Sequence, residues 1–173
     1  MHLINRTRGL TLIELVVTLS IAAILLAAAA PSFSGIIKNN KMTTQLNELV
    51  AGLNLARSES IKRASPITVC KSSDGTSCGG NWNNGWIVFP DLDNSGSVTN
   101  SEEVLRGYVP PKNGAILSSI SDEIIFDAEG YSVNYSNKTF LLCDDRGDLN
   151  KKGLITSNTG RIRTAQTYEL SSC

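Results

Sequence analysis

The chain has 173 residues, of which 16 are Lys or Arg and 16 are Asp or Glu. This length accommodates one domain plus a membrane segment. The balanced charge excludes a strongly basic surface over the whole protein, so any binding of nucleic acid has to come from a local patch.

An apolar run from Leu10 to Ala30 dominates the N-terminal region, and Glu14 is the only charged residue within it. The length of the run is close to the ~20 apolar residues that span a bilayer. Arg6 and Arg8 precede the run, which predicts a cytoplasmic N-terminus and a single pass through the membrane. A secretory signal peptide is the alternative, although its apolar region is usually only ~7–15 residues long.

The run begins with the string GLTLIE, residues 9–14. A carboxylate in a membrane helix is costly, so Glu14 is either an interfacial residue that reaches water or a functional residue. The string resembles the class III signal of type IV pilins and type II secretion pseudopilins. This resemblance implies that residues 1–9 are a leader peptide, which a prepilin peptidase removes by cutting after Gly9. It also implies that Leu10, where the family usually has phenylalanine, becomes the methylated N-terminus, and that Glu14 pairs with the N-terminal amine of a neighbouring subunit.

Cleavage after Gly9 removes the only histidine, His2, and leaves 14 basic and 16 acidic side chains, a net charge of −2. A chain without histidine cannot form Ser-His-Asp or Cys-His catalytic sites and lacks a ligand of most zinc sites. We therefore expect no enzymatic activity.

The segment after Pro31 is amphipathic as far as about Ala64. Its apolar residues recur at three- and four-residue spacing: Leu46, Leu49, Val50, Leu53 and Ala56. A proline bends a helix without necessarily ending it. We therefore predict one helix from Leu10 to about Arg63, roughly 80 Å long at the usual rise per residue. The predicted kink at Pro31 resembles the kink of pilin helices.

This helix divides into a membrane and assembly half, residues 10–30, and an amphipathic half, residues 31–64. Residues 65–173 have short β-segments separated by clusters of Asn, Gly, Asp and Ser. The predicted strands are Ile67–Cys70, Trp86–Phe89, Val104–Val109, Ile124–Phe126, Tyr131–Tyr135, Thr139–Cys143, Leu154–Thr156 and Arg161–Thr164. No connection between them is long enough for a helical crossover, so the strands are expected to pair antiparallel. The result is an α+β domain, with one long helix packed on antiparallel sheets.

The four cysteines, Cys70, Cys78, Cys143 and Cys173, all follow the apolar run. An even number in an exported domain indicates two disulfides, for which three connectivities are possible. We favour Cys70–Cys78, which closes a short loop, and Cys143–Cys173, which holds the C-terminus. None of the spacings is CxxC, which argues against a redox or zinc site. The domain is therefore expected in the periplasm or outside the cell.

Several strings after residue 55 occur in a characteristic order: ARSESIKR, VC followed by a second cysteine, GWIVFPD, IIFDAEG, FLLCDDRG and SNTGRIR. Together with the N-terminal helix, they resemble the GspH/FimT branch of pilin-like proteins over nearly the whole chain. That branch includes secretion pseudopilins, minor pilins that initiate or cap type IV pili, and FimT-type minor pilins that bind DNA for transformation.

The stretch from Asp91 to Glu102 has the spacing of an EF-hand calcium loop, with oxygen donors at positions 1, 3 and 5, glycine at 6 and glutamate at 12. The candidate ligands are Asp91, Asp93, Ser95, Ser97 and Glu102. Predicted strands flank this stretch in place of the helices of an EF-hand, and acidic residues are also common in solvated turns. Two interpretations stay open: a calcium clamp on a long loop, and a hairpin loop without metal.

A second candidate site is the string GRIR, residues 160–163, with Lys151 and Lys152 nearby in the sequence. In a strand, Arg161 and Arg163 share one face, and paired guanidinium groups suit phosphate. The string resembles the GRxR motif of DNA-binding FimT proteins. The alternatives are a solvated strand or ion pairs with the acidic residues Asp144, Asp145 and Asp148. Binding to DNA through these arginines should be weak, salt-dependent and indifferent to sequence.

Three functions were compared: a structural subunit, a DNA receptor and an enzyme. We favour a pilin-like subunit, either a minor pilin or a pseudopilin, which assembles through its N-terminal helix into a type IV pilus or a type II secretion pseudopilus. The alternative is a minor pilin that binds DNA non-specifically during natural transformation. The expected partners are other pilins or pseudopilins, the prepilin peptidase and the inner membrane, with the C-terminal domain in the periplasm. No cofactor is expected beyond the candidate calcium ion.

Overall fold

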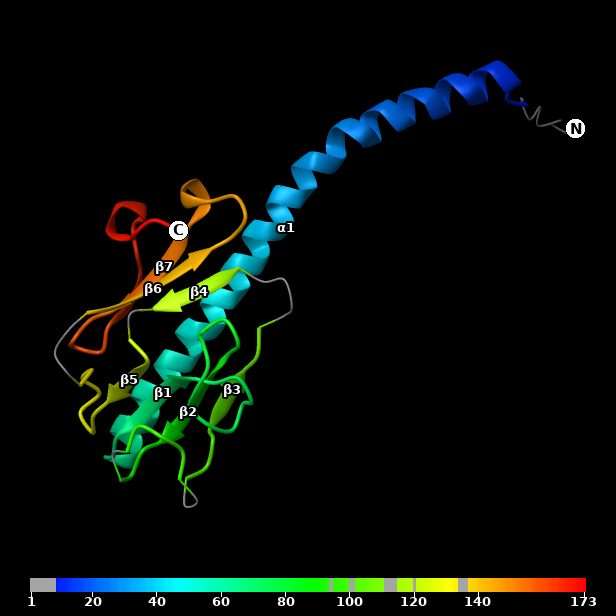
Figure 1. Ribbon diagram of the computed structural model, residues 1–173. Coiled ribbons are helices and arrows are strands. Elements are labelled where there is room, and N and C mark those ends of the chain that lie inside the picture. Colours follow the sequence, from blue (N-terminus) through cyan, green and yellow to red (C-terminus); the bar gives the residue numbers. More distant parts are fainter. Residues whose placement is uncertain (1–8, 94, 100–101, 111–114, 120, 134–136) are drawn as a thin grey trace, which may run out of the picture. The chain divides into compact units, whose positions relative to one another are not determined.

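The computed structural model describes residues 9–93, 95–99, 102–110, 115–119, 121–133 and 137–173. The chain divides into two compact units, residues 1–38 and 39–173, and helix α1 (Leu12–Arg63) contributes to both. The strands are β1 (Ile67–Lys71), β2 (Trp86–Pro90), β3 (Arg106–Tyr108), β4 (Ile116–Ser119), β5 (Glu123–Phe126), β6 (Lys138–Cys143), β7 (Lys152–Thr156) and β8 (Ile162–Thr164). Two short 3-10 helices, η1 (Asp148–Asn150) and η2 (Thr167–Glu169), complete the described elements (Figure 1).

The first unit is the N-terminal part of α1. The hydroxyl of Thr11 accepts a hydrogen bond from the backbone N–H of Glu14 (3.3 Å), and the carbonyl of Thr11 accepts one from Leu15 (3.2 Å). This cap satisfies donors that would otherwise lack a partner, and the helix therefore begins at Leu12, two residues after the predicted start. The large apolar side chains from Leu12 to Leu26 are exposed.

The kink at Pro31 and the membrane segment are two further predictions about the N-terminal part of this helix. The helix continues through Pro31, but the side chains of residues 28–32 lie outside the described part of the chain, so the kink stays a prediction. Among the described residues, we find no helix with the length and apolar character needed to cross a membrane.

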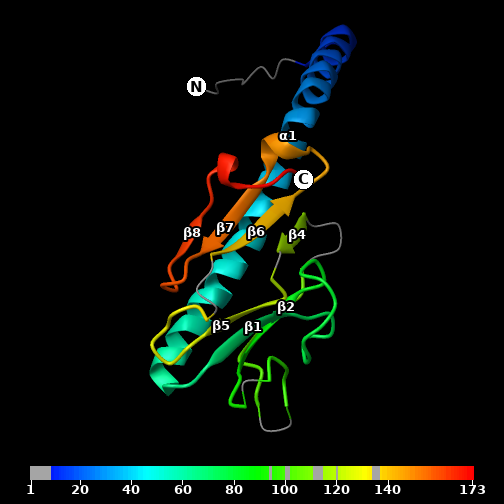
Figure 2. The ribbon, with the colours of Figure 1, turned by 60° about the vertical axis from the view of Figure 1, so that its left-hand side comes forward.

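The second unit contains two four-stranded antiparallel sheets. Sheet A has the strand order β3-β2-β1-β5, and sheet B has the order β4-β6-β7-β8. Figure 2 shows the strands of sheet B side by side in this order. The antiparallel pairing and the α+β class predicted from the sequence are confirmed.

The main core of the second unit joins the C-terminal part of α1 to both sheets. Met42, Leu46, Leu49, Leu53 and Ala56 of the helix are buried against apolar residues of β1, β2, β5, β4, β6 and β7. Gly52 lies on the same helical face, where an added Cβ would collide with the indole ring of Trp86. The helix ends at Arg63 because Ala64 adopts a positive φ of 48° and the sequence then reaches Pro66.

Two details differ from the predicted strands among the described residues. Of the predicted strand Tyr131–Tyr135, the described residues 131–133 form only a single bridge, between Ser132 and Phe126, and residues 134 and 135 lie outside the described residues. Strand β4 was not predicted, because Ile116–Ser119 contains two serines and only two apolar residues. The remaining predicted strands are present with end shifts of one or two residues.

A segment outside the sheets covers the outer face of each sheet. On sheet A, Val98 and Val104 pack against Cys70, Ile87 and Phe89. On sheet B, the C-terminal segment 165–173, here called the strap, places Ala165 and Leu170 on Leu141 and Ile155. Disulfides join Cys70 to Cys78 and Cys143 to Cys173, as predicted, and the second one holds the strap.

Candidate functional site

The predicted processing site lies at the start of α1. Gly9 and Leu10 precede the helix and are exposed, and Leu10 has 74% of its surface accessible. Glu14 is exposed in the first helical turn. A negative charge at this end of a helix interacts favourably with the helix dipole. The Thr11 cap, which the sequence reasoning missed, could have been found from the Thr-x-x-Glu pattern of a capping box. The cap uses the backbone N–H of Glu14, so its carboxylate contributes to the helix start only through its charge.

The acidic loop, residues 91–102, brings together three of the five candidate calcium ligands. Carboxylate oxygens of Asp91, Asp93 and Glu102 lie within 4.8 Å of one another. Hard oxygen donors of this kind fit Ca²⁺. Ser95 donates its hydroxyl to the carbonyl of Ser97 (2.9 Å), so its side chain also stabilises the turn.

Protein donors already engage each of these carboxylates. Asp91 is fully buried and accepts hydrogen bonds from the hydroxyl of Thr68 (2.9 Å) and from the backbone N–H groups of Ser95 and Gly96. Glu102 accepts from the N–H groups of Leu92 and Thr99, both at 2.8 Å. The carboxylates therefore hold the described residues of the loop in place, and calcium binding stays a prediction.

Glu123 of β5 is a further carboxylate beside this loop. Its side chain lies close enough to Gly96 that an added Cβ would be 2.7 Å from Oε2. Burial raises the pKa of Glu123, and the negative charges of Asp91 and Asp122 raise it further. The pKa of Asp93 is lowered, mainly by the hydrogen bond with the side chain of Ser95. The sequence pattern missed Glu123 because it lies on a different strand.

Gly160, the first residue of the GRIR string, has a structural role. It adopts a positive φ of 73°, and an added Cβ would collide with the carbonyl oxygen of Gly130. That carbonyl also accepts a hydrogen bond from Nε of Arg57 on α1 (3.1 Å). The close approach of two turns beside Arg57 therefore requires glycine, independently of any ligand.

The two arginines of the string are exposed as predicted, whereas Ile162 packs against the core. Arg163 is not a free cation, because it forms two hydrogen bonds with the carboxylate of Glu169, at 2.6 and 2.8 Å. This ion pair raises the pKa of Arg163 and lowers that of Glu169 to about 2. The expected acidic partners were Asp144, Asp145 and Asp148, so the sequence missed the actual partner in the strap.

The two lysines have structural contacts of their own. Lys151 donates to the backbone carbonyls of Leu170 (3.2 Å) and Ser171 (3.0 Å) and so anchors the strap. Lys152 donates to the hydroxyl of Thr43 on α1 (2.6 Å). These contacts hold both ammonium groups against the protein and leave their charges in place.

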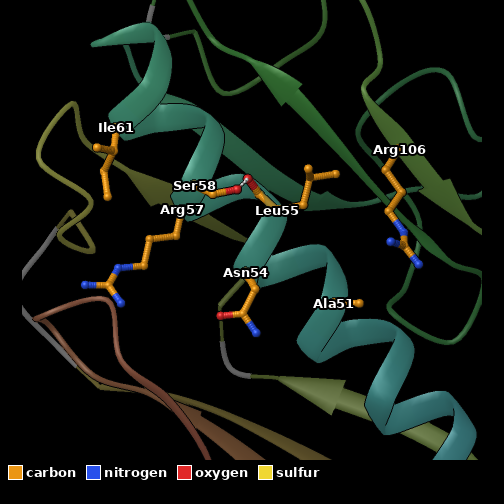
Figure 3. Close-up of a pocket in the computed structure, with 7 residues that line it drawn as sticks. All are labelled: Ala51, Asn54, Leu55, Arg57, Ser58, Ile61 and Arg106. Atoms are coloured by element: carbon orange, nitrogen blue, oxygen red, sulfur yellow. Dashed lines mark hydrogen bonds between the residues drawn. The ribbon is translucent and has the colours of Figure 1, made fainter.

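An open groove of about 610 Å³ lies along the exposed face of α1. Its lining consists of Ala51, Asn54, Leu55, Arg57, Ser58, Ile61 and Arg106. Figure 3 shows Arg57 and Arg106 on opposite sides of the helix. Arg106 is paired with Glu48 at 2.7 Å. The lining therefore combines two arginines and the polar Asn54 and Ser58 with three apolar side chains.

Comparison with known proteins identifies the family. Residues 45–160 match the family described as Type II transport protein GspH, and residues 4–30 match the prokaryotic N-terminal methylation motif. The chain belongs to the GspH family. As a GspH protein with this motif, it is a non-enzymatic pilin-type subunit, a minor pilin or pseudopilin of a type II secretion pseudopilus or a type IV pilus.

Solved structures agree on the fold. Two crystal forms of the type IV minor pilin FimU from Pseudomonas aeruginosa align with TM-scores of 0.60 and 0.59, at 24% and 22% sequence identity. The alignments cover 78% and 76% of this chain, and 93% and 96% of the FimU chains. A comparison with curated protein sequences finds no match.

The GspH family and its motif imply assembly with other pilins, processing by a prepilin peptidase and anchoring in the inner membrane before assembly.

Proposed function

We propose that this GspH protein is cleaved after Gly9, methylated at Leu10 and inserted into its filament through the helix that begins at Leu12. The observation that carries the proposal is the match of the methylation motif over residues 4–30. The exposure of Gly9 and Leu10 ahead of the helix supports it, because a peptidase needs access to the bond that it cuts. Gly9→Val should leave full-length precursor in the membrane fraction, whereas normal processing of that variant would contradict the proposed cleavage.

Glu14 is assigned the role of pairing with the N-terminal amine of a neighbouring subunit. Its position in an exposed, otherwise apolar helix supports this role, since an unpaired carboxylate is costly in apolar surroundings. Glu14→Gln keeps the shape of the side chain and removes the charge. It should abolish incorporation into filaments while processing continues.

Thr11→Ala is the matched control for Glu14→Gln. It removes the helix cap and keeps the charge of Glu14. If Glu14 acts only through the helix terminus, the two variants should lose incorporation to the same extent. A loss confined to Glu14→Gln supports the intersubunit pair.

DNA binding by the GRIR arginines is the second candidate, and the exposure of both arginines favours it. The purified domain from residue 39 to residue 173 should then bind duplex DNA more weakly as salt rises. Arg161→Gln should reduce this binding and lower the salt slope by about one unit. Arg163→Gln should have a smaller specific effect, because Glu169 already neutralises that guanidinium. If the domain shows no salt-sensitive binding at high micromolar concentration, this candidate is excluded.

A further inference from the structure

Two almost fully exposed hydrophobic side chains lie at one end of sheet B. Leu149 of η1 has 94% of its surface exposed and Tyr168 of η2 has 86%, the two highest values among the described large hydrophobic residues. The backbone N–H of Cys173 donates to the carboxylate of Asp148 (2.6 Å), so the end of the strap is joined to η1. Both ribbon views show η1 and η2 at the same end of the sheet (Figures 1 and 2). Single exposed hydrophobic residues are common, but two on joined turns indicate a contact surface.

This end of sheet B lies beside the first helical residues of the second unit. Lys152, which directly begins β7 after η1, donates to the hydroxyl of Thr43 (2.6 Å). Gln45 donates to the carbonyl of Ala115 (3.1 Å), just before β4 begins at the same end of the sheet. The second unit starts at Asn39. The chain therefore enters the domain at the end that carries the two exposed side chains.

The segment that enters here is the apolar N-terminal segment. No charged residue lies between Glu14 and Lys38. The methylation motif and the GspH family imply that this segment anchors the protein in the inner membrane before assembly. A lysine that ends an apolar segment suits the level of the lipid headgroups. Because the domain begins one residue later, at Asn39, chain connectivity keeps this end of the domain near the bilayer surface.

The two side chains have the chemistry of a membrane interface. Tyrosine combines an apolar ring with a polar hydroxyl and is enriched where membranes meet water. Leu149 has so little contact with its own domain that it can enter the acyl boundary without any rearrangement. In a protein interface, an apolar anchor fills a matching pocket on the partner, whereas a bilayer accepts a protruding side chain without one. A lipid surface therefore fits this pair of turns.

We propose that Leu149 and Tyr168 insert into the membrane interface and hold this end of the domain on the bilayer while the subunit is anchored there. The occupant of the surface is the boundary between headgroups and acyl chains. The inference goes beyond the proposed function, because it concerns the subunit before it enters a filament. The contact is lost when the N-terminal segment leaves the membrane, so docking is confined to the membrane pool of the protein.

The first test measures whether position 168 reaches lipid. The full-length, uncleaved chain is placed as a single copy in nanodiscs of phosphatidylethanolamine and phosphatidylglycerol, which excludes contacts with a second subunit. With Tyr168→Trp, phospholipids brominated on their acyl chains should quench the added emission, and that emission should be shifted to shorter wavelength. The native Trp82 and Trp86 are buried, and the wild-type chain gives their background signal.

Tyr131→Trp is the matched control. Tyr131 is also exposed, at 50% of its surface, and it follows Gly130, whose carbonyl accepts the hydrogen bond from Arg57. Arg57 is about 21 Å along the helix axis from Thr43, so this tyrosine lies far from the proposed membrane end. Its replacement should not be quenched. Equal quenching at positions 131 and 168, or none at either, overturns the proposal.

The second test removes one of the two insertions. Leu149→Asp in the Tyr168→Trp chain should lower the ratio of docked to undocked domain roughly tenfold, because a buried leucine is exchanged for a charge. Leu92→Asp is the control, since Leu92 is an exposed leucine of the acidic loop beyond β2. Quenching that is unaffected by Leu149→Asp, or is reduced equally by both substitutions, overturns the role of Leu149.

The salt dependence and the membrane fraction decide between the remaining outcomes. Apolar insertion should persist at high salt, whereas quenching that disappears there shows electrostatic attraction and overturns the insertion. If the chain does not stay with the nanodiscs, the anchoring fails and docking fails with it. Because the chain in this experiment is uncleaved and unassembled, a failure of docking leaves cleavage after Gly9 and filament assembly to be judged by their own tests.

Discussion

The outer faces of sheets A and B are covered in different ways. In the acidic loop on sheet A, carboxylates accept hydrogen bonds from backbone N–H groups a few residues away. Asp91, for example, accepts them from Ser95 and Gly96. The strap on sheet B is held by contacts between distant residues: a disulfide across 30 residues, and the bonds from Lys151 to the carbonyls of Leu170 and Ser171. The acidic loop is therefore held mainly by bonds within itself, with one bond from Thr68 on β1, whereas every bond named for the strap comes from a residue at least 19 positions away.

The two disulfides provide the largest expected difference. In the chain-entropy model, a loop closed across 30 residues contributes about 3.6 kcal/mol, and one closed across 8 residues about 2.5 kcal/mol. Replacing Cys143 and Cys173 by serine should therefore lower the free energy of unfolding more than replacing Cys70 and Cys78. Urea unfolding of the domain from residue 39 to residue 173 measures both. If replacing Cys70 and Cys78 lowers the free energy of unfolding more than replacing Cys143 and Cys173, the strap is not the part that depends more on its disulfide.

Asp91→Ala tests how far the acidic loop depends on its buried carboxylate. The substitution leaves the buried hydroxyl of Thr68 and the N–H of Gly96 without an acceptor, whereas the N–H of Ser95 still donates to Asp93. An uncompensated buried donor should cost about 1–3 kcal/mol. Asp93→Ala is the matched control on the same loop, because Asp93 is exposed. It should cost less than about 0.5 kcal/mol, as is usual at surface positions. Equal effects of the two substitutions in urea unfolding would show that burial does not determine the role of Asp91.

Calcium binding would be a further difference between the acidic loop and the strap. Among the described residues, only the acidic loop has a candidate cation site. Affinities of extracellular calcium modules, about 10⁻⁴–10⁻³ M, predict that 10 mM Ca²⁺ stabilises the domain by about 1.4–2.7 kcal/mol. Glu102→Gln should remove this shift in the thermal midpoint, and Mg²⁺ should not reproduce it. No shift with wild type favours the solvated hairpin loop.

The sequence predicted the elements of the fold well wherever the pattern is local. The helix and most strands follow from periodicity and turn residues, and the disulfide pairs are the ones favoured among three possible connectivities. Strand β4 was missed because it forms by pairing with β6, which a window of four residues cannot reveal. The ion pair between Arg163 and Glu169 was missed for a related reason: the strap turns back at η2, and the acidic residues considered were those that precede the strand.

The roles of glycine and of buried carboxylates were also beyond the sequence pattern. The GRIR string indicated phosphate binding, whereas the structure gives Gly160 a packing role against Gly130 and Arg57. The spacing of the acidic loop indicated metal ligands, whereas the partner of Asp91 on β1, Thr68, lies 23 residues away in the chain. Long-range contacts of this kind decide whether a polar residue is structural or available to a ligand.

The smallest expected effects concern Glu169 in the strap and Glu123 of β5, which lies beside the acidic loop, and they should have opposite signs. Glu169 in the strap has a folded-state pKa of about 2, below its ordinary value, because of Arg163. Its contribution to stability is therefore present at neutral pH and is lost as pH falls from about 4.3 towards 2. For Glu123 beside the acidic loop, burial raises the pKa. Its ionised form therefore opposes folding at neutral pH, and this penalty disappears as pH falls below the raised pKa.

Glu169→Gln should accordingly lower the thermal midpoint slightly at pH 7, with a difference from wild type that disappears towards pH 2. Glu123→Gln should raise the midpoint slightly at pH 7, because the neutral amide avoids the repulsion from Asp91 and Asp122. Thermal unfolding of the domain between pH 2 and pH 7 measures both differences, and an NMR titration of the two carboxylates measures their pKa values directly. If both substitutions shift the thermal midpoint in the same direction at pH 7, the predicted difference between the two glutamates is contradicted. Glu123 would then also be stabilised in its ionised form. A titration of Glu169 near its ordinary value would show that Arg163 is free to meet an anionic ligand.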